Sequence, residues 1–359
     1  MIANIQLLRA VAAWMVVAHH LRDGLSEIWL PLGALVFASG VDLFFVISGF
    51  VMVVSTEGRN MSPMAFWRRR LVRVVPLYWL VTAAMLAMLL AGLNPVGVTR
   101  WDWGDALTSF LFLADVRADT YPGPIVAVGW TLVFEAFFYG IFGAALVVRN
   151  HINPACVVCS VMAVLVAAGL ILTPENHALQ IYTAPLLLEF AVGALIAKLV
   201  ISKMSAPSAL RSRPSALVVA GSLTVLLGVV LAMAGGGVLS AMAPDYNIVD
   251  PALAATGWRA VFFGGPAVLV VLGAVALDRS GVTCRAGFWM TQGAASYALY
   301  LTHQIVMQML EKGLGDGWLA ALITIPVLGA VAVAVHLGME KPVTAWLSAP
   351  RFRLQRLPG

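Results

Sequence analysis

Arg9 and His20 stand eleven residues apart in the first long apolar stretch of the sequence. A helix turns by about 100° per residue, so this spacing places both side chains on one face. The rise of about 1.5 Å per residue separates them by roughly 16 Å along the axis, about half the thickness of a bilayer's hydrocarbon core. A cation near one membrane surface and an imidazole at depth predict a path that leads inward from that surface. Ionisable groups inside membrane helices are costly, which makes them candidates for function.

Four more ionisable residues fall within other apolar stretches: Asp42, Glu135, Glu189 and His303. Together with His20 they come from five different segments, and this predicts that they converge on a polar cavity. A carboxylate that bonds to a histidine would fix the tautomer of the imidazole and raise its basicity. Such an arrangement suits general-base catalysis on a hydroxyl group.

A dense basic cluster, Arg68-Arg69-Arg70-Leu71-Val72-Arg73, precedes the third apolar stretch. Guanidinium groups bind phosphate through two parallel hydrogen bonds, and a helix N-terminus adds a favourable dipole. The same cluster is also typical of a topogenic signal that contacts lipid headgroups. Its predicted place on the same membrane face as Arg9 favours a phosphorylated ligand.

The composition predicts an integral membrane protein of the all-α class. The chain has 359 residues, of which 61% are hydrophobic and 11% are charged, and its mean hydropathy is +0.92. Soluble globular proteins carry about 25% charged residues. We therefore expect a polytopic bundle of about ten transmembrane helices. The expected spans are 5–22, 33–55, 71–92, 124–148, 154–173, 179–199, 215–235, 259–278, 289–310 and 317–339. Residues 106–114 are apolar but too short to span a membrane.

The distribution of charge predicts the orientation of these spans. Of the 22 Lys and Arg residues, only five fall in the odd-numbered loops: Arg22, Arg100, Arg117, Arg259 and Lys312. The positive-inside rule then places both termini in the cytoplasm. The net charge of +5 is explained by this asymmetry and by the anionic inner leaflet, so no nucleic-acid partner is expected and the bilayer is the expected partner.

The three cysteines do not indicate a metal site. Cys156 and Cys159 form a C-x-x-C pair, but no second Cys or His pair accompanies them as a zinc site would require. We expect no metal ion and no tightly bound cofactor.

Several segments resemble, in the same order along nearly the whole chain, the acyltransferase 3 family of membrane O-acyltransferases. They are Arg9 with His20, Gly40-Val41-Asp42-Leu43-Phe44-Phe45 with Val46-Ile47-Ser48-Gly49-Phe50, Arg69-Arg70 with Arg73 and Pro76, Trp130 with Glu135 and Phe138-Tyr139, Glu189-Phe190, and Ser296-Tyr297 with Tyr300 and His303. The opening Asn4-Ile5-Gln6-Leu7-Leu8-Arg9-Ala10 is similar to bacterial exopolysaccharide acetyltransferases in particular.

The resemblance implies an acyl-CoA-dependent transferase, with acetyl-CoA as the expected donor and a carbohydrate hydroxyl as the acceptor. It implies a multi-pass protein of the bacterial cytoplasmic (inner) membrane, with a membrane domain over 1–345 and a cytoplasmic tail over 346–359. The acyl-CoA phosphates would dock at Arg9, Arg69, Arg70 and Arg73. His20 would act as general base or carry the acyl group itself, and Asp42, Glu135 and His303 would orient or polarise the reacting groups. The expected supporting residues are Trp130, Tyr139, Glu189, Tyr297 and Tyr300.

Two other functions compete with this interpretation. A proton-coupled transporter or flippase for a glycan intermediate would also bury carboxylates and histidines, but the sequence shows no internal repeat of the kind typical of many transporters. A haem protein would need histidines paired across two helices, and the spacing of the deep histidines does not indicate this. The sequence leaves open the acceptor, the acyl length and the oligomeric state.

Overall fold

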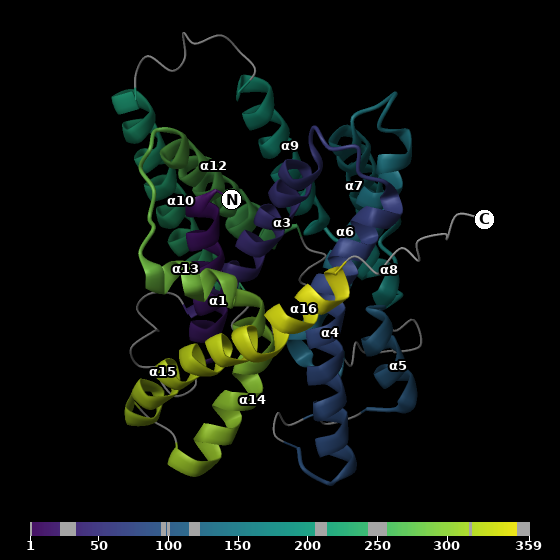
Figure 1. The fold of residues 1–359 in the computed structure, drawn as a ribbon, viewed down its shortest axis with the longest axis vertical. Coiled ribbons are helices and arrows are strands. Elements are labelled where there is room, and N and C mark those ends of the chain that lie inside the picture. Colours follow the sequence, from purple (N-terminus) through teal and green to yellow (C-terminus); the bar gives the residue numbers. More distant parts are fainter. Residues whose placement is uncertain are drawn as a thin grey trace, which may run out of the picture.

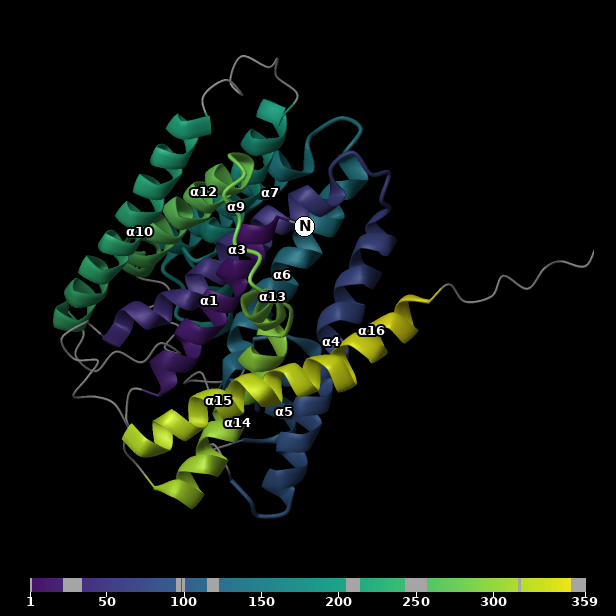
Figure 2. The same cartoon turned by 60° about the vertical axis from the view of Figure 1, so that its left-hand side comes forward.

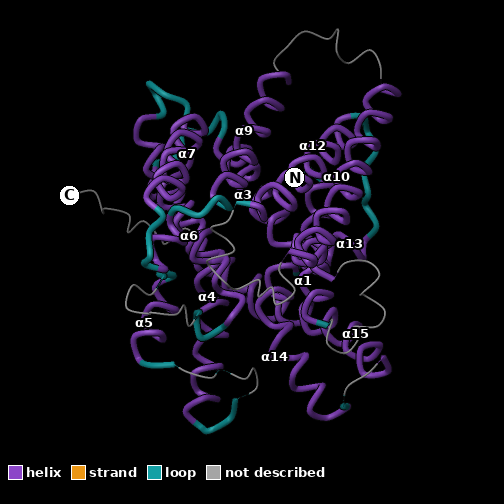
Figure 3. Tube along the Cα trace, turned by 180° about the vertical axis from the view of Figure 1, so that it is seen from behind, coloured by secondary structure: helices purple, strands orange, loops and turns teal. Residues whose placement is uncertain are grey.

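The computed structural model describes residues 2–21, 34–94, 98, 101–114, 123–204, 214–242, 257–315 and 318–349. Within these ranges the chain forms helices, turns and loops, with no strand (Figure 3). The all-α prediction is therefore confirmed. The prediction for the tail over 346–359 falls mostly outside the described residues, and the last described helix runs to Ser348.

The helices that form the bundle follow one another along the chain. Their bounds are α1 (Ala3–His20), α3 (Gly40–Thr56), α4 (Pro63–Leu90), α5 (Trp103–Leu111), α6 (Trp130–Ala145), α7 (Pro154–Leu172), α8 (His177–Tyr182), α9 (Leu187–Met204), α10 (Pro214–Met242), α12 (Gly265–Arg279), α13 (Gly287–Ala294), α14 (Ser296–Leu314), α15 (Trp318–Val335) and α16 (Lys341–Ser348). Short 3-10 segments occupy η2 (Ala34–Ser39), η3 (Ala127–Gly129) and η4 (Leu146–Val148), and π-helical turns occupy η6 (Ala260–Gly264) and η7 (His336–Glu340).

Eight of the ten expected spans coincide with helices long and apolar enough to cross a membrane. The first and ninth expected spans are also helical, as α1 and α14, but both carry several polar side chains and are less apolar. The ninth is broken at Ala295 into α13 and α14, where a single span over 289–310 was expected. The short apolar segment 106–114 contributes to α5, which has nine residues and cannot span a bilayer.

The helix of the third expected span, α4, begins earlier than the hydropathy of the sequence predicts. α4 starts at Pro63, where Ser62 accepts a hydrogen bond from the Ala65 N–H as its N-cap, so the arginine cluster lies within the helix. Because residues three apart share a helix face, Arg70 and Arg73 point the same way. α15, η7 and α16 form one long rod that crosses the front of the bundle (Figures 1 and 2).

Close helix pairs in this bundle depend on glycine. A methyl group on Gly49 of α3 would lie 2.0 Å from the Phe190 carbonyl oxygen of α9, and one on Gly193 would lie 2.1 Å from the Val46 carbonyl oxygen. Small residues allow such backbone approach between membrane helices, where packing replaces the hydrophobic effect as the driving force. The Phe45 ring stacks on Phe190 at 4.4 Å beside this contact, which fixes α3 against α9.

The outer helices present apolar side chains outward. α7 and α10 expose leucine, valine and isoleucine side chains along their length, among them Val164, Leu170, Leu223 and Leu226. Such a surface is costly in water and suits lipid contact. α1 and α3, by contrast, bury most of their residues and form the centre of the bundle (Figure 1).

Candidate active site

A cavity of about 370 Å³ lies between α1, α3, α4, α6 and α14. Its polar and aromatic wall residues include Gln6, Arg9, Phe44, Phe45, Ser48, Ser55, Arg59, Arg70, Arg73, Thr131, Glu135, Tyr139, Ser296, Tyr297 and Tyr300. We call it the arginine cavity. Segments more than 280 residues apart in the sequence meet there, because the N-terminal half of α1 packs against the start of α14.

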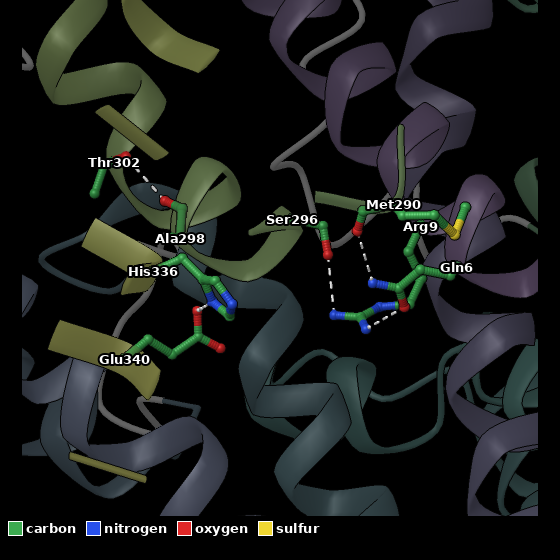
Figure 4. Close-up of polar contacts among 8 residues, drawn as sticks. All are labelled: Gln6, Arg9, Met290, Ser296, Ala298, Thr302, His336 and Glu340. Atoms are coloured by element: carbon green, nitrogen blue, oxygen red, sulfur yellow. Dashed lines mark hydrogen bonds and ion pairs between the residues drawn. The ribbon is translucent and has the colours of Figure 1, made fainter. Parts of the chain in front are cut away.

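Arg9 is held in place from two helices. Its guanidinium donates to the Gln6 carboxamide oxygen at 3.3 Å and to the Ser296 hydroxyl at 3.0 Å (Figure 4). Gln6 is itself anchored, because its amide donates to the Met290 carbonyl oxygen at 3.4 Å. The Arg9 side chain is thus pre-positioned at the cavity wall, which lowers the entropic cost of binding an anion.

Of the predicted arginines on α4, Arg70 and Arg73 line the cavity and Arg69 does not. Arg70 donates to the Ser55 hydroxyl at 2.8 Å, and its guanidinium lies over the Phe66 and Tyr139 rings at 5.5 and 5.9 Å. Arg69 is exposed and lies outside the cavity wall. The helix period separates them, since Arg69 is turned about 100° from Arg70.

Glu135 places a carboxylate in the same cavity. Its Oε1 accepts hydrogen bonds from the Ser48 hydroxyl at 3.0 Å and from the Tyr139 hydroxyl. Tyr297 also lines the cavity and donates to the Val74 carbonyl oxygen of α4 at 2.7 Å. Tyr139 and Tyr297, two of the residues expected to have a supporting role, therefore stand at the cavity wall.

His20 and His303 meet beyond the arginine cavity, although they are 283 positions apart in the sequence. His303 Nε2 lies 3.3 Å from His20 Nδ1, and the ring centroids are 5.0 Å apart. His303 is fully buried, and its Nδ1 lies 2.8 Å from the Tyr300 carbonyl oxygen. Of the five residues expected to converge on one polar cavity, these two meet, and among the described residues backbone carbonyls rather than a carboxylate orient His303.

These contacts fix the tautomers of the neutral rings. A carbonyl oxygen only accepts, so His303 carries its hydrogen on Nδ1 and its Nε2 is an acceptor. His20 Nδ1 lies 2.9 Å from the Val16 carbonyl oxygen, so it also carries hydrogen, and His303 Nε2 at 3.3 Å is a second, more distant acceptor for that one hydrogen. The lone pair of His20 is then on Nε2, which is the nitrogen that a general base uses.

The histidine pair adjoins a second, small cavity of about 20 Å³, which we call the histidine cavity. It has room for about one water-sized group. Its wall includes His19, His20, Trp130 and Gln304. Ile5, Gln6 and Arg9 of α1 line the arginine cavity and Val16, His19 and His20 line the histidine cavity, so the two cavities follow one another along one helix.

Val41 and Tyr300 line both cavities and form the partition between them. The Tyr300 hydroxyl donates to the Val128 carbonyl oxygen at 3.0 Å and hydrogen bonds with the Thr131 hydroxyl at 2.8 Å. These bonds tie the start of α14 to the start of α6 and hold the ring in the partition. Arg9 and His20 therefore face neighbouring cavities that share a wall of two side chains.

Asp42 and Glu189 belong to a different cluster. Asp42 is fully buried and its two carboxylate oxygens accept from Arg259 at 2.6 and 3.1 Å. Glu189 is buried beside this ion pair, packed against the backbone of Gly264. The structure does not bring Asp42 or Glu189 to the wall of either cavity.

Arg259 shows why the sequence analysis misplaced this cluster. It was assigned to an outer loop, but it is only 1% exposed, and its guanidinium lies over the Trp130 ring at 5.9 Å. A charge at the edge of an apolar stretch can turn inward when a carboxylate is available there. Four further residues line the arginine cavity without having been expected there: Arg59, Ser48, Ser55 and Ser296. Ser48 and Ser296 belong to the segments that resemble the family, but a single hydroxyl has no distinctive spacing that would assign it a role.

Comparisons with known proteins identify relatives of this chain. The chain is 30% identical over 313 residues to the exopolysaccharide production protein ExoZ of Rhizobium meliloti, covering 85% of this chain and 89% of that protein. It is 28% identical over 163 residues to the peptidoglycan O-acetyltransferase OatA of Listeria monocytogenes, covering 41% of this chain and 24% of that protein. It is 37% identical over 106 residues to nodulation protein 10 of Rhizobium leguminosarum bv. viciae, covering 27% of this chain and 28% of that protein.

No solved structure matches the chain. A family model described as an acyltransferase domain matches residues 2–339, a range that is nearly the whole chain and contains both cavities. This match supports the transferase prediction rather than the transporter or haem alternatives. The chain belongs to the acyltransferase 3 family.

Proposed function

We propose that this protein transfers an acyl group, acetyl in the first instance, from acyl-CoA to a hydroxyl of a sugar in an extracytoplasmic or lipid-linked glycan. The observation that carries the proposal is the adjacency of the two cavities. A cationic cavity suited to the phosphates of a thioester donor shares the Val41–Tyr300 partition with an imidazole pair suited to activating an alcohol.

The charge of the arginine cavity supports an anionic donor. Arg9, Arg59, Arg70 and Arg73 face it together with one carboxylate, Glu135, so the wall has a net positive charge. Guanidinium groups form strong, charge-assisted hydrogen bonds with phosphate. The apolar stretch of α3 that lines the rest of the cavity suits the pantetheine arm, and the arm would point along α1 toward His20.

The chemistry assigned to His20 is general-base catalysis. Nε2 takes the proton from the acceptor hydroxyl as its oxygen attacks the thioester carbonyl carbon. The carbon–sulfur bond then breaks, the acyl group stays on the acceptor oxygen, and the CoA thiolate leaves and is protonated. His303 is a positioning residue, since its Nε2 and the Val16 carbonyl oxygen are the two acceptors for the His20 Nδ1 hydrogen and together keep the His20 lone pair on Nε2.

The acceptor and the orientation are proposed from the relatives and from the charge distribution. ExoZ is named for exopolysaccharide production and OatA for peptidoglycan O-acetylation, so a surface carbohydrate is the proposed acceptor class. We place the end of the bundle with Arg59 and Arg70 on the cytoplasmic side of a bacterial inner membrane, with both termini there, in accord with the positive-inside rule. The donor then need not cross the bilayer.

The proposal is tested with purified protein in lipid nanodiscs, supplied with radiolabelled acetyl-CoA and a surface glycan extract from a host that lacks this protein. We expect label in the glycan, released by mild base as an ester would be. His20→Ala should lose most of this transfer. His177→Ala is its matched control, because His177 lies on α8 and bonds to Gln180 outside both cavities. Glycan transport in sealed vesicles without any label transfer would contradict the proposal and support the transporter alternative.

A further inference from the structure

A third cavity, of about 320 Å³, opens beside the arginine cavity and is not used by the mechanism above. It lies between the turn that joins α3 to α4 and the turn that joins η4 to α7. Its wall consists of Val53, Thr56, Glu57, Gly58, Arg59, Asn60, Phe142, Leu146, Arg149, Asn150, Asn153, Pro154 and Ala155. Arg59 lines both this cavity and the arginine cavity, so the two are neighbours.

The wall of this third cavity combines two guanidinium groups with three carboxamides. The groups are those of Arg59, Arg149, Asn60, Asn150 and Asn153. Carboxamides can donate and accept at once, which suits the edge of a nucleobase, and guanidinium groups suit phosphate. Among the described residues of the wall, the one carboxylate is Glu57, which forms an ion pair with Lys198 at 3.3 Å, so its charge is offset.

Some of the polar side chains in this wall form hydrogen bonds within the described part of the protein, and others do not. Arg149 donates to the Met61 carbonyl oxygen, and the Asn153 side chain accepts from the Ala155 N–H at 2.9 Å. Among the described residues, the side chains of Arg59, Asn60 and Asn150 make no hydrogen bond within the protein. Arg59 thus stands between the two cavities, and Asn60 and Asn150 stand in the third cavity, all without a side-chain hydrogen bond to the part of the protein that the structure describes. This arrangement suits one long ligand that extends from the arginine cavity into the third cavity.

We propose that the third cavity binds the nucleotide end of the acyl-CoA donor, the 3′-phosphorylated adenosine, with Arg59 contacting phosphate where the two cavities meet. This inference rests on the proposed function, because it assumes that the arginine cavity holds the pantetheine arm. The same chemistry, a phosphate ester on guanidinium, would also fit an anionic lipid headgroup, and the test separates the two.

The test compares three acetyl donors in nanodiscs of neutral lipid: acetyl-CoA, acetyl-dephospho-CoA and S-acetyl-4′-phosphopantetheine. We expect the wild-type protein to have its highest kcat/KM with acetyl-CoA. Arg59→Ala and Asn150→Ala should reduce this preference over S-acetyl-4′-phosphopantetheine by about tenfold or more, through a higher KM for acetyl-CoA. Arg68→Ala is the matched control, because Arg68 is exposed and donates to the Leu347 carbonyl oxygen outside all three cavities.

The outcomes distinguish this inference from the proposed function. If no donor is used by the wild-type protein, the proposed function itself fails. If the wild-type protein uses acetyl-CoA and S-acetyl-4′-phosphopantetheine with equal kcat/KM, the proposed function stands and the nucleotide site is refuted. The assay is repeated in nanodiscs that contain anionic lipid. If Arg59→Ala alters activity only there, and equally for all donors, the third cavity binds a headgroup and the nucleotide assignment is wrong. Arg59→Lys, which keeps the charge, should retain more of the preference than Arg59→Ala.

Discussion

The pairing of Asp42 with Arg259 predicts that Asp42 stabilises the fold rather than taking part in acyl transfer. Asp42 is 0% exposed and Arg259 is 1% exposed, and two hydrogen bonds of 2.6 and 3.1 Å join them. Arg259→Met therefore leaves a buried carboxylate without its cation. Removing one partner of such a pair costs about 3–5 kcal/mol, which is a large part of the roughly 5–15 kcal/mol that keeps a typical protein folded.

The double variant Asp42→Leu/Arg259→Met separates the two roles. With both charges gone, most of the loss should be recovered, because replacing a buried ion pair by apolar side chains is often neutral or stabilising. The assay is the thermal midpoint of the purified protein in detergent, followed by acetyl transfer per folded molecule in nanodiscs. We expect Arg259→Met to melt well below the double variant, and the double variant to keep a transfer rate within about tenfold of wild type.

One result would refute this reasoning. A double variant that melts near the wild-type temperature but has lost transfer as completely as a His20 variant would show that the Asp42 carboxylate takes part in catalysis. Asp42 would then have to reach the reacting groups in a conformation other than the one in which Arg259 holds it.

Three further predictions follow from the cavities and the packing. Arg73→Ala should raise the KM for acetyl-CoA by about tenfold, because Arg73 lines the arginine cavity, whereas Arg69→Ala should change this KM little. Equal effects of the two variants would contradict the assignment of Arg73, and not Arg69, to the donor site. Val41→Phe should thicken the partition between the two cavities and reduce kcat at least tenfold in protein that is saturated with donor, with saturation checked by equilibrium dialysis. An unaltered kcat would show that the acyl group takes another path. Gly49→Ala should lower the thermal midpoint by an amount equivalent to about 1–3 kcal/mol, because its methyl group would meet a backbone carbonyl of α9 at 2.0 Å. Gly140→Ala should leave the thermal midpoint unchanged, because its methyl group would have no neighbouring atom within 4 Å among the described residues.

Much of the architecture was predictable from local patterns. Apolar runs of helix length identified eight of the spans, because a bilayer demands that length and composition. The boundary of α4 was missed because hydropathy reports apolarity, and the arginines of its first turns mask a helix that begins at Pro63. The Ser62 cap and the proline after it are the signals that could have located this start.

The site was predictable where spacing along one helix carried the information. The interval between Arg9 and His20 correctly placed them on one side of α1, and the same rule applied to α4 would have separated Arg69 from Arg70. A general convergence of the buried ionisable groups was expected, but the specific partners across more than 200 residues were not predictable from one sequence. Nothing local indicates that Arg259 turns inward to Asp42, or that His303 meets His20 rather than a carboxylate.

The most direct test of the central claim is the steady-state kinetics of His20→Ala with acetyl-CoA as the varied donor. General-base catalysis contributes about 10²- to 10⁴-fold, so we predict a fall in kcat of that size, with the KM for acetyl-CoA nearly unchanged because Arg9, Arg70 and Arg73 are intact. A transfer rate near that of the wild-type protein, measured on folded His20→Ala protein that still binds acetyl-CoA, would contradict the claim that the donor in the arginine cavity reacts at this imidazole.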